Sequence, residues 1–487
     1  MKPDWAALAP RDRRALIAVD LGAESCRVSM LRWTDGKARV ELVHRFANNP
    51  RESDGGLRWD LNMIAAGLED GLRKCARIAT EGIRSIAVDG WAVDYVRIDA
   101  DGAPLEDPFC YRDERTLAAE VSAHKKISPE RLREITGIQL LRINTLYQLH
   151  ADTLAERPSG VQWMNLPEYF LARWGGSRVA EYTNATHTQM VDLYRKVWSE
   201  EIFDAMGFAP GRALTIVPPG TVVGRLSGPL AGLEAFRDTV LIAPGCHDTA
   251  SAIAGIPAVG NDWAYISSGT WSLVGTLLEQ PRSGDAVKAE NFTNLGAVGD
   301  RVCFHKNVNG MWLVRQCMDA WAAEGKAWKI EDLVKAAEAV EKPTGMLDVD
   351  DPDLLLAGDM PQRINRQRQA KGRRPMDESS AGAPAMASLI FHSLAARYAQ
   401  VLKRIALHSG KELERLFVVG GASQNEFLNR LTAEATGLKV FRGSAESSTV
   451  GNFAVQLAVL DGDRDRVTGV FAENVSHWAE LLVGVMA

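Results

Sequence analysis

Two segments of the chain, residues 16–31 and 264–277, repeat one pattern: an apolar strand, a polar turn with glycine, and a returning strand. The first reads LIAVDLGAESCRVSML and the second AYISSGTWSLVGTL. After the first turn, Val28, Met30 and Trp33 recur with polar residues between them, which is typical of a second strand and not of a helix. Two similar hairpins in one chain predict two similar halves.

The rest of the chain alternates between strand and helix patterns. Short apolar strands such as RSIAVDG, TVLIAP and RLFVVGG are separated by helical segments, and apolar residues recur at helical spacing in 60–79 and 386–405. This alternation predicts an α/β fold. A stretch rich in Gly and Pro at 255–262 divides the 487 residues into predicted domains 1–256 and 257–487.

Composition and charge argue against several classes of partner. Hydrophobic residues make up 46% and charged residues 24% of the chain, and the formal net charge is -6, so no nucleic-acid partner is expected. No apolar run approaches the roughly 20 residues of a membrane span, and the first residues lack the apolar core of a signal peptide. The six cysteines include no C-x-x-C pair and fit free thiols, so we expect a cytoplasmic protein.

The first hairpin places a carboxylate, Asp20, at the end of a strand, directly before glycine and small side chains. This turn lacks the Gly-Lys-Ser/Thr of a Walker loop and the three spaced glycines of a dinucleotide fingerprint. It still brings backbone N–H groups close to whatever lies at its tip, and nucleotide phosphates favour such a place.

Four further stretches also follow apolar strands with glycine, small hydroxyl residues or acids. They are DGWAVDY (89–95), GCHDTAS (245–251), SSGTWS (267–272) and VVGGASQN (418–425). Each stretch taken alone is equally typical of a turn, and the His-Asp pair before a helix is typical of an N-cap followed by a first-turn acid. Five such strand ends together predict a ligand-binding crevice.

These stretches occur in the order of a known family. Together with FCYRDERT (109–116), INTLYQL (143–149), EYTNATHTQM (181–190) and KNVNGMWL (306–313), they resemble the FGGY family of sugar kinases, from Ile17 to about Leu460. The resemblance implies two actin-like, ribonuclease H-like domains that flank an ATP and sugar cleft. It also implies that domain 1–256 mainly binds sugar and that domain 257–487 mainly binds nucleotide.

The resemblance further implies a reaction: transfer of the γ-phosphoryl group of ATP to a ketose, a small-molecule partner. INTLYQL and YTNATHTQ are more similar to family members that convert L-rhamnulose to L-rhamnulose 1-phosphate in rhamnose catabolism than to glycerol or xylulose kinases. L-fuculose and L-xylulose remain alternatives. A non-catalytic actin-like ATP-binding protein is the alternative from another class, and Asp20 and Asp248 argue against it because a silent relative needs neither carboxylate.

Phosphoryl transfer requires a group that takes the proton of the attacking hydroxyl, and a carboxylate suits this task. The resemblance implies Asp248 as this general base. It implies substrate contacts from Ala92, His247, Asp248 and Thr249, with Trp91 and Asp94 beside the sugar. It implies ATP contacts from Ala23, Glu24, Ser25, Cys26, Arg27, Thr270, Asn307, Arg315 and Gly421. Asp20 is expected to hold Mg²⁺ through its water shell.

Five positions depart from the family pattern: Glu24, Cys26, Ala92, Arg315 and Ala422. Ala92 stands where relatives carry glycine, and one methyl group in a pocket is worth about 1 to 3 kcal/mol, which is enough to shift substrate choice. Glu24 would bring a negative charge near phosphates. We therefore expect Glu24 to face solvent or to pair with an arginine.

Overall fold

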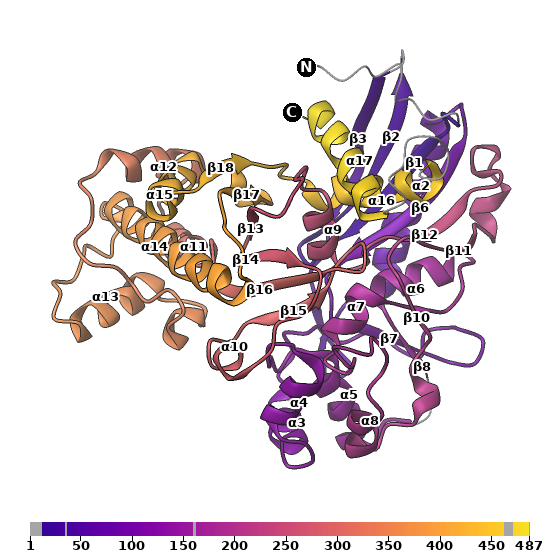
Figure 1. Cartoon of the computed structure of the whole chain (residues 1–487), viewed down its shortest axis with the longest axis horizontal. Helices are drawn as coiled ribbons and strands as arrows, with labels where there is room; N and C mark the ends of the chain where they lie inside the picture. Colours follow the sequence, from indigo (N-terminus) through magenta and orange to yellow (C-terminus); the bar gives the residue numbers. More distant parts are fainter. Residues whose placement is uncertain (1–11, 35–36, 159–161, 462–470, 487) are drawn as a thin grey trace. The chain divides into compact units, whose positions relative to one another are not determined.

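The computed structural model describes residues 12–34, 37–158, 162–461 and 471–486 (Figure 1). The chain divides into two compact units. Unit 1 comprises 1–259, 277–303 and 447–487, and unit 2 comprises 260–276 and 304–446. The first break lies beside the boundary predicted near residue 256, but the units are discontinuous in sequence because two later segments return to unit 1. In the described ranges, none of the helices is both long and apolar enough to span a bilayer.

The main sheet of unit 1 has the strand order β11-β12-β6-β1-β2-β3. Strands β1 (Ala15–Leu21), β2 (Ser25–Thr34) and β3 (Lys37–Ala47) are antiparallel neighbours, and the register pairs Asp20 with Arg27 across the first turn. The predicted first hairpin is therefore confirmed. Strands β6 (Ile83–Gly90) and β12 (Val240–Ala243) continue the sheet in parallel with β1, and β11 (Thr221–Arg225) is the antiparallel edge.

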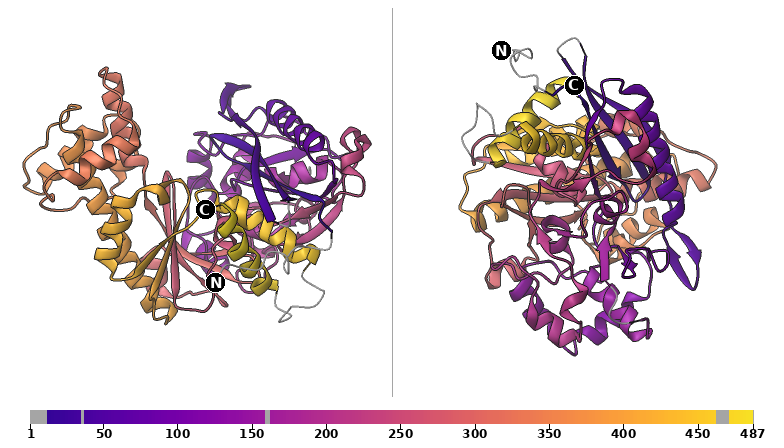
Figure 2. Two further views of the ribbon diagram at one scale, coloured as in Figure 1. Left: turned by 90° about the horizontal axis from the view of Figure 1, so that it is seen from above. Right: turned by 90° about the vertical axis from the view of Figure 1, so that its right-hand side faces the viewer.

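Alternation along β1 decides which helices each side chain meets. Ile17, Val19 and Leu21 belong to the core with α2 (Leu61–Ile78) and α6 (Leu166–Arg173). Leu16 and Ala18 belong to the core on the other face, with α16 (Ser447–Asp461) and α17 (Phe471–Met486). Figures 1 and 2 show these two yellow helices against the indigo strands. Because successive side chains point to opposite faces, Asp20 lies on the α16 face.

The predicted helix at 60–79 is also confirmed. Helix α2 begins after Asp60, whose side chain accepts a hydrogen bond of 2.9 Å from the backbone N–H of Met63, as an N-cap does. The buried residues of α2 include Leu61, Ile64 and Leu68, which are the positions that repeat at helical spacing in the sequence.

Unit 1 also carries smaller elements around the ends of its sheet strands. The short strands are β4 (Arg51–Ser53), β5 (Gly56–Arg58), β7 (Tyr95–Ile98), β8 (Gln162–Asn165), β9 (Ala180–Glu181) and β10 (Ile216–Val217). The helices are α3 (Thr116–Ala123), α4 (Pro129–Thr136), α5 (Thr145–Leu154), α7 (Tyr182–His187), α8 (Glu200–Met206), α9 (Asp248–Ala254), α10 (Asp285–Ala289) and the 3₁₀ turns η1 (Pro210–Arg212), η2 (Pro229–Gly232) and η3 (Glu234–Phe236).

Helices α9 and α16 of unit 1 pack backbone against backbone. A Cβ atom added to Gly451 in α16 would lie 1.8 Å from the carbonyl oxygen of Ser251 in α9. A Cβ atom on Gly255, at the end of α9, would lie 2.4 Å from the carbonyl oxygen of Ser447. Both distances are far below van der Waals contact, so only glycine allows this approach.

The second sheet has the order β15-β16-β14-β13-β17-β18. Its strands are β13 (Trp263–Ser268), β14 (Trp271–Leu278), β15 (Thr293–Gly296), β16 (Val302–Asn309), β17 (Arg415–Val419) and β18 (Lys439–Arg442). Strands β13 and β14 form an antiparallel hairpin, which confirms the second predicted hairpin, and β17 runs parallel to β13. The halves therefore share a motif, as the sequence repeat predicts.

The helices of unit 2 gather around one long helix. This is α14 (Ala383–Ser409), and it contains the predicted helical segment 386–405. The other elements are α11 (Trp312–Ala323), α12 (Ile330–Ala339), α13 (Met360–Ala370), α15 (Glu426–Thr436) and the 3₁₀ turns η4 (Pro352–Leu355) and η5 (Gly421–Gln424). Helix α14 packs against α12 and α15, which are drawn beside it in orange in Figure 1.

Candidate active site

The first hairpin holds Asp20 in an ion pair with the residue opposite it. The Arg27 Nη1 donates a hydrogen bond of 3.0 Å to Asp20 Oδ2, and the Ser448 hydroxyl donates one of 3.2 Å to the same oxygen. Asp20 is buried and Arg27 is half-buried. The turn between them requires glycine, because a Cβ on Gly22 would lie 2.4 Å from the carbonyl oxygen of Ser25. A carboxylate and a guanidinium thus stand together at the tip of the first strand.

The predicted phosphate-contact residues of this turn differ in exposure. Glu24 is exposed, as predicted, and Ala23 is half-buried. The buried Ser25 accepts a hydrogen bond of 3.1 Å from Arg45 Nε. Cys26 is also buried, and burial raises the pKa of its thiol to about 12, so it stays protonated at neutral pH. The side chains of Ser25 and Cys26 therefore face protein groups, and Arg27 is the residue of this turn whose charge suits a phosphate.

Asp248 is the first residue of α9, and His247 is the N-cap residue of that helix. His247 makes no side-chain cap hydrogen bond, and Asp248 occupies the first turn. The His247 Nε2 lies 3.5 Å from Asp248 Oδ1, and the Thr249 hydroxyl donates to that oxygen at 3.3 Å. Two of the residues predicted to contact the sugar, His247 and Thr249, therefore flank the carboxylate of a third, Asp248, and about 36% of the Asp248 side chain is exposed.

The surroundings of Asp248 favour its protonated form. Burial is the main cause, the negative charge of Asp20 adds to it, and together they raise the pKa of Asp248 to about 7. A carboxylate with a pKa near neutrality suits a general base, because it is ionised in part at working pH and accepts a proton readily.

A third carboxylate, Asp89, lies at the end of β6. Asp89 pairs with Asp20 in the parallel register of β6 and β1, is fully buried, and accepts a hydrogen bond of 2.9 Å from Asn452 Nδ2 in α16. Burial and the charges of Asp20 and Asp248 raise its pKa well above the ordinary value.

The negative charge of Asp20 raises the pKa of both Asp89 and Asp248. Carboxylates placed in this way suit a hydrated divalent cation, which needs one or two carboxylates and keeps several waters. In the described ranges, no group of three or more His, Cys, Asp or Glu side chains is arranged to ligate a metal directly. The assignment of Mg²⁺ to Asp20 through water fits these residues and remains a prediction.

The segment after β6 carries Ala92 next to the turn that leads into α9. The Gly90 N–H donates a hydrogen bond of 2.9 Å to the Cys246 carbonyl, and Gly90 and His247 form an isolated parallel β-bridge. Val93 follows Ala92 with φ of +72°, a conformation that costs a β-branched residue roughly 1–3 kcal/mol. Its carbonyl accepts hydrogen bonds from the Thr145 hydroxyl at 2.7 Å and from Gln148 Nε2 at 3.3 Å. INTLYQL thus holds the strained turn beside Ala92.

Asp94 orients the side chains around this turn. Its Oδ2 accepts hydrogen bonds from the indole N–H of Trp59 at 2.6 Å and of Trp91 at 3.0 Å, and its Oδ1 accepts from Gln148 Nε2 at 3.0 Å. It is fully buried, and burial raises its pKa to about 6 although these donors oppose the shift. Its described contacts are with protein donors, so Asp94 holds the indole of Trp91 in place, and a position of Trp91 and Asp94 beside a sugar remains a prediction.

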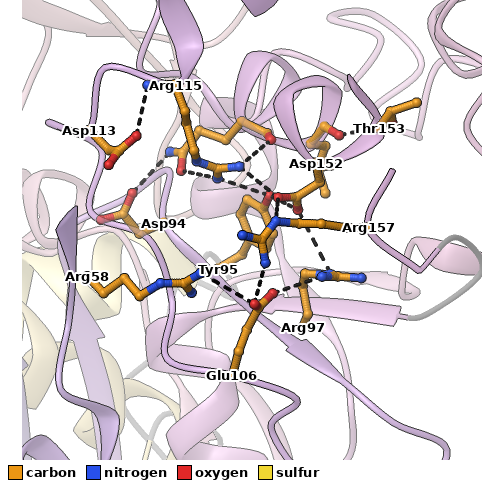
Figure 3. A network of polar contacts seen from close by, with 12 residues as sticks. Arg58, Asp94, Tyr95, Arg97, Glu106, Asp113, Arg115, Asp152, Thr153 and Arg157 are labelled. Atoms are coloured by element: carbon orange, nitrogen blue, oxygen red, sulfur yellow. Dashed lines mark hydrogen bonds and ion pairs between the residues drawn. The ribbon is translucent and has the colours of Figure 1, made fainter. Parts of the chain in front are cut away.

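Behind Asp94 lies an ionic network that fixes β7 and α5 (Figure 3). Asp152 accepts from the Tyr95 hydroxyl at 2.6 Å and from Arg115 Nη1 at 2.7 Å. The guanidinium of Arg115 also lies 3.9 Å from the ring centre of Phe109. In Figure 3, Arg58, Arg97 and Arg157 converge on Glu106. Phe109 and Arg115 of the FCYRDERT motif therefore take part in this network.

Unit 2 carries the four predicted nucleotide contacts of the C-terminal half. Thr270 is exposed in the turn of the second hairpin, and Gly421 is exposed at the start of η5, after β17. The two turns touch, because Gly420, with φ of +85°, approaches the Ser268 carbonyl so closely that a Cβ would lie 2.7 Å from it. A Cβ on Gly421 would meet no atom within 4 Å, so a flat group can lie against its backbone.

The other two predicted nucleotide contacts are less confined. Asn307 is half-buried in β16. Arg315 is on the exposed surface of α11, where its Nε donates a hydrogen bond of 3.1 Å to Asp319, one helical turn further on. Its role as a nucleotide contact remains a prediction.

Three residues that contact the predicted site were missed by the sequence interpretation. Asp89 had a local signal, since it ends an apolar strand as Asp20 does. Glu181 had a partial signal, because it begins the motif EYTNATHTQM. Ser448 had none, since its contact with Asp20 depends on the return of the C-terminal helices to unit 1.

Comparisons with known sequences agree with this geometry. Residues 15–255 match the N-terminal domain and residues 264–459 the C-terminal domain of the FGGY family of carbohydrate kinases. A rhamnulokinase of Enterococcus faecalis is 34% identical over 451 residues, covering 92% of this chain and 89% of the relative. A rhamnulokinase of Pectobacterium carotovorum is 35% identical over 472 residues, covering 95% of this chain and 91% of the relative.

Solved structures agree on the fold. A ligand-bound xylulose kinase from Lactobacillus acidophilus matches with a TM-score of 0.75 at 15% identity, over 97% of each chain. A glycerol kinase from Plasmodium falciparum, solved with ADP, matches with a TM-score of 0.72 at 13% identity, over 96% of this chain and 92% of the other. The actin-like fold expected for the two halves is confirmed. The chain belongs to the FGGY family of carbohydrate kinases, and it is a sugar kinase.

Proposed function

We propose that this kinase transfers the γ-phosphoryl group of ATP to L-rhamnulose and yields L-rhamnulose 1-phosphate, as a step of rhamnose catabolism. The similarity to rhamnulokinases over more than nine-tenths of the chain supports this substrate. The observation that carries the proposal is the partly exposed Asp248 carboxylate, which begins α9 between His247 and Thr249.

In this proposal Asp248 accepts the proton of the attacking ketose hydroxyl. His247 and Thr249 orient the sugar, and Ala92 lies beside it on the neighbouring turn. When bound, Mg²⁺ neutralises charge on the phosphates, and Asp20 would hold it through water. Arg27 adds a positive charge at the first hairpin, where phosphoryl transfer requires electrostatic stabilisation more than covalent chemistry.

Thr270 and Gly421 are the proposed nucleotide contacts of unit 2. Their turns touch at Gly420, and the open space above Gly421 supports contact with adenosine. Asn307 and Arg315 are the other two proposed nucleotide contacts, and Arg315 would have to leave its ion pair with Asp319 to reach the nucleotide.

L-fuculose and L-xylulose are the alternative substrates. Each is a ketose, and the extra methyl group of Ala92 alters the pocket relative to kinases with glycine at this position. The match to a xylulose kinase structure supports the fold alone at 15% identity, so it does not favour L-xylulose.

The decisive experiment measures ADP release from ATP and Mg²⁺ with a panel of ketoses, and identifies the phosphorylated position. We expect L-rhamnulose to have the highest kcat/KM. If another ketose exceeds it, the substrate assignment is wrong while the kinase assignment stands.

Asp248→Asn tests the mechanism in the same assay. Asparagine keeps the shape and can still hydrogen-bond a hydroxyl, but it cannot accept the proton. We expect kcat to fall at least about 100-fold, with ATP and ketose binding near wild type by calorimetry. Asp285→Asn, on the exposed helix α10, is the matched control and should leave kcat unchanged. An active Asp248→Asn enzyme would refute Asp248 as the base.

A further inference from the structure

Glu181 is a buried carboxyl residue in a motif that the proposed reaction does not use. It ends the short strand β9 and caps α7, where its Oε1 accepts a hydrogen bond of 3.0 Å from the Thr183 N–H. It has no exposed surface. A short exposed helix would be capped equally well by serine or aspartate, so a fully buried glutamate at this point needs a further explanation.

The explanation lies in the other oxygen of Glu181. Its Oε2 accepts a hydrogen bond of 2.8 Å from the backbone N–H of Cys246 and a second one from the Thr183 hydroxyl. The Thr183 hydroxyl in turn accepts a hydrogen bond of 3.1 Å from the backbone N–H of His247. The backbone N–H groups of the two residues directly before Asp248 therefore donate hydrogen bonds to Glu181 and Thr183, which are themselves hydrogen-bonded to each other.

The same turn is held from its other side by β6. The carbonyl of Cys246 accepts from the Gly90 N–H at 2.9 Å, as described above. The turn from Gly245 to His247 thus lies between a sheet strand and Glu181, and both hold it through its backbone groups. Because α9 begins at the next residue, the position of this turn sets the position of Asp248.

A second buried carboxyl group, Glu168 in α6, supports Glu181. Its Oε1 accepts from the Glu181 N–H at 3.1 Å, and its Oε2 accepts from Asn184 Nδ2 at 3.0 Å. Burial raises the pKa of Glu168 to about 7 and that of Glu181 to about 8. Such groups reduce stability relative to apolar residues, so their presence beside the site favours a functional role over a purely structural one.

The geometry points to Glu181 as a positioning residue: with Thr183, it holds the Cys246–His247 backbone and thereby places Asp248 and His247 toward the ketose. This inference rests on the proposed function for the identity of the base. The competing explanation is that Glu181 only caps α7.

Glu181→Asp separates the two explanations. Aspartate is among the best N-cap residues, so it keeps the cap of α7. Its side chain is shorter by one methylene, which withdraws the carboxylate by about 1.5 Å and breaks the 2.8 Å hydrogen bond to the Cys246 N–H. If Glu181 positions the turn, we expect kcat to fall about 10- to 100-fold, since small displacements of reacting groups have effects of this size. The KM for ATP should stay within about twofold.

Substitutions of Thr183 test the inference independently of Glu181. Thr183→Val removes the hydroxyl at constant shape and should lower kcat in the same way, whereas Thr183→Ser keeps the hydroxyl and should restore it. Thr188→Val is the matched control, because the buried Thr188 hydroxyl donates only to the nearby Ala185 carbonyl. It should lose no activity.

Hydrogen exchange on peptides that cover 244–249 reports the turn without any turnover. Faster exchange in Glu181→Asp and Thr183→Val than in wild type and Thr188→Val supports the inference. Wild-type kcat in Glu181→Asp, or unchanged exchange at the turn, overturns it. If the wild-type protein phosphorylates no ketose in the panel, the proposed function fails, and the exchange data still decide whether Glu181 holds the turn.

Discussion

Gly451→Ala reverses the usual effect of this substitution in a helix. Alanine is favoured over glycine in a helix interior by about 1 kcal/mol, so propensity alone predicts a gain in stability. In this chain the new Cβ would lie 1.8 Å from the carbonyl oxygen of Ser251, where ordinary contacts are 3.4–4 Å. Helices α9 and α16 must therefore separate by roughly 1.5 Å, because neither atom is the free end of a flexible side chain.

The cost of that separation exceeds the gain in propensity. Overpacking a core costs about 1 to 3 kcal/mol and occasionally more. Separation also disturbs the Gly255 N–H to Ser251 carbonyl hydrogen bond in α9 and opens the apolar contact around Val450 and Phe453. With a cost in the upper part of that range, we expect a net loss of about 1 to 2 kcal/mol, which lowers the Tm by about 2 to 8 °C at roughly 2 to 4 °C per kcal/mol for a large domain.

Thermal melting followed by circular dichroism at one fixed scan rate measures this effect. Gly232→Ala in η2 is the control, because its added Cβ would meet no atom within 4 Å, and we expect its Tm within about 1 °C of wild type. The Gly451→Ala variant should also lose activity, since α16 carries Ser448 to Asp20 and α9 carries Asp248. An unchanged or higher Tm for Gly451→Ala would refute the close approach of the two helices.

Three further predictions follow from the site. Ala92→Gly removes the methyl group beside the proposed sugar and should change the ratios of kcat/KM between ketoses by up to about 10-fold, and constant ratios would remove Ala92 from the pocket. Glu24→Ser should leave the KM for ATP unchanged or lower, because Glu24 is exposed, and a large rise would assign Glu24 to the nucleotide or metal. Burial raises the pKa of Glu168 from 4.5 to about 7, so the native state keeps a proton that the unfolded chain loses. The stability that this group contributes is full below about pH 4.5 and is lost as pH rises through about 7, so Glu168→Gln should flatten the decline in Tm between pH 5 and 7.5.

Local patterns in the sequence were sufficient for the elements that carry the site. The two hairpins, α2 and α14 were predicted because side-chain periodicity and glycine turns are properties of neighbouring residues. The motif 245–251 also placed Asp248 at the start of a helix, since the residues that begin α9 are adjacent in the chain. Glu24 was expected to face solvent or to pair with an arginine, because the resemblance places it near phosphates, and the first of these alternatives is observed.

The sequence was less informative about what each polar side chain contacts. Asp94 was expected beside the sugar, but its position depends on Trp59 and Gln148, which come from distant segments and turn its oxygens toward protein donors. The division of the chain also shows this limit. Segments 277–303 and 447–487 both belong to unit 1. The second segment joins it because apolar residues of α16 and α17 pack on the sheet, and no local signal in that segment identifies this partner.

The sequence by itself determined the hairpins, the main helices, the family and the residue types at the strand ends, because each depends on residues close together in the chain. Only the tertiary structure decided that Ser448 and Arg27 share Asp20, that Asn452 binds Asp89, and that Glu181 holds the turn before Asp248. Apart from the Asp20–Arg27 pair, which lies within the first hairpin, these contacts join segments far apart in sequence. Their geometry follows from how β1, β6, α9 and α16 pack, and packing depends on all the faces at once.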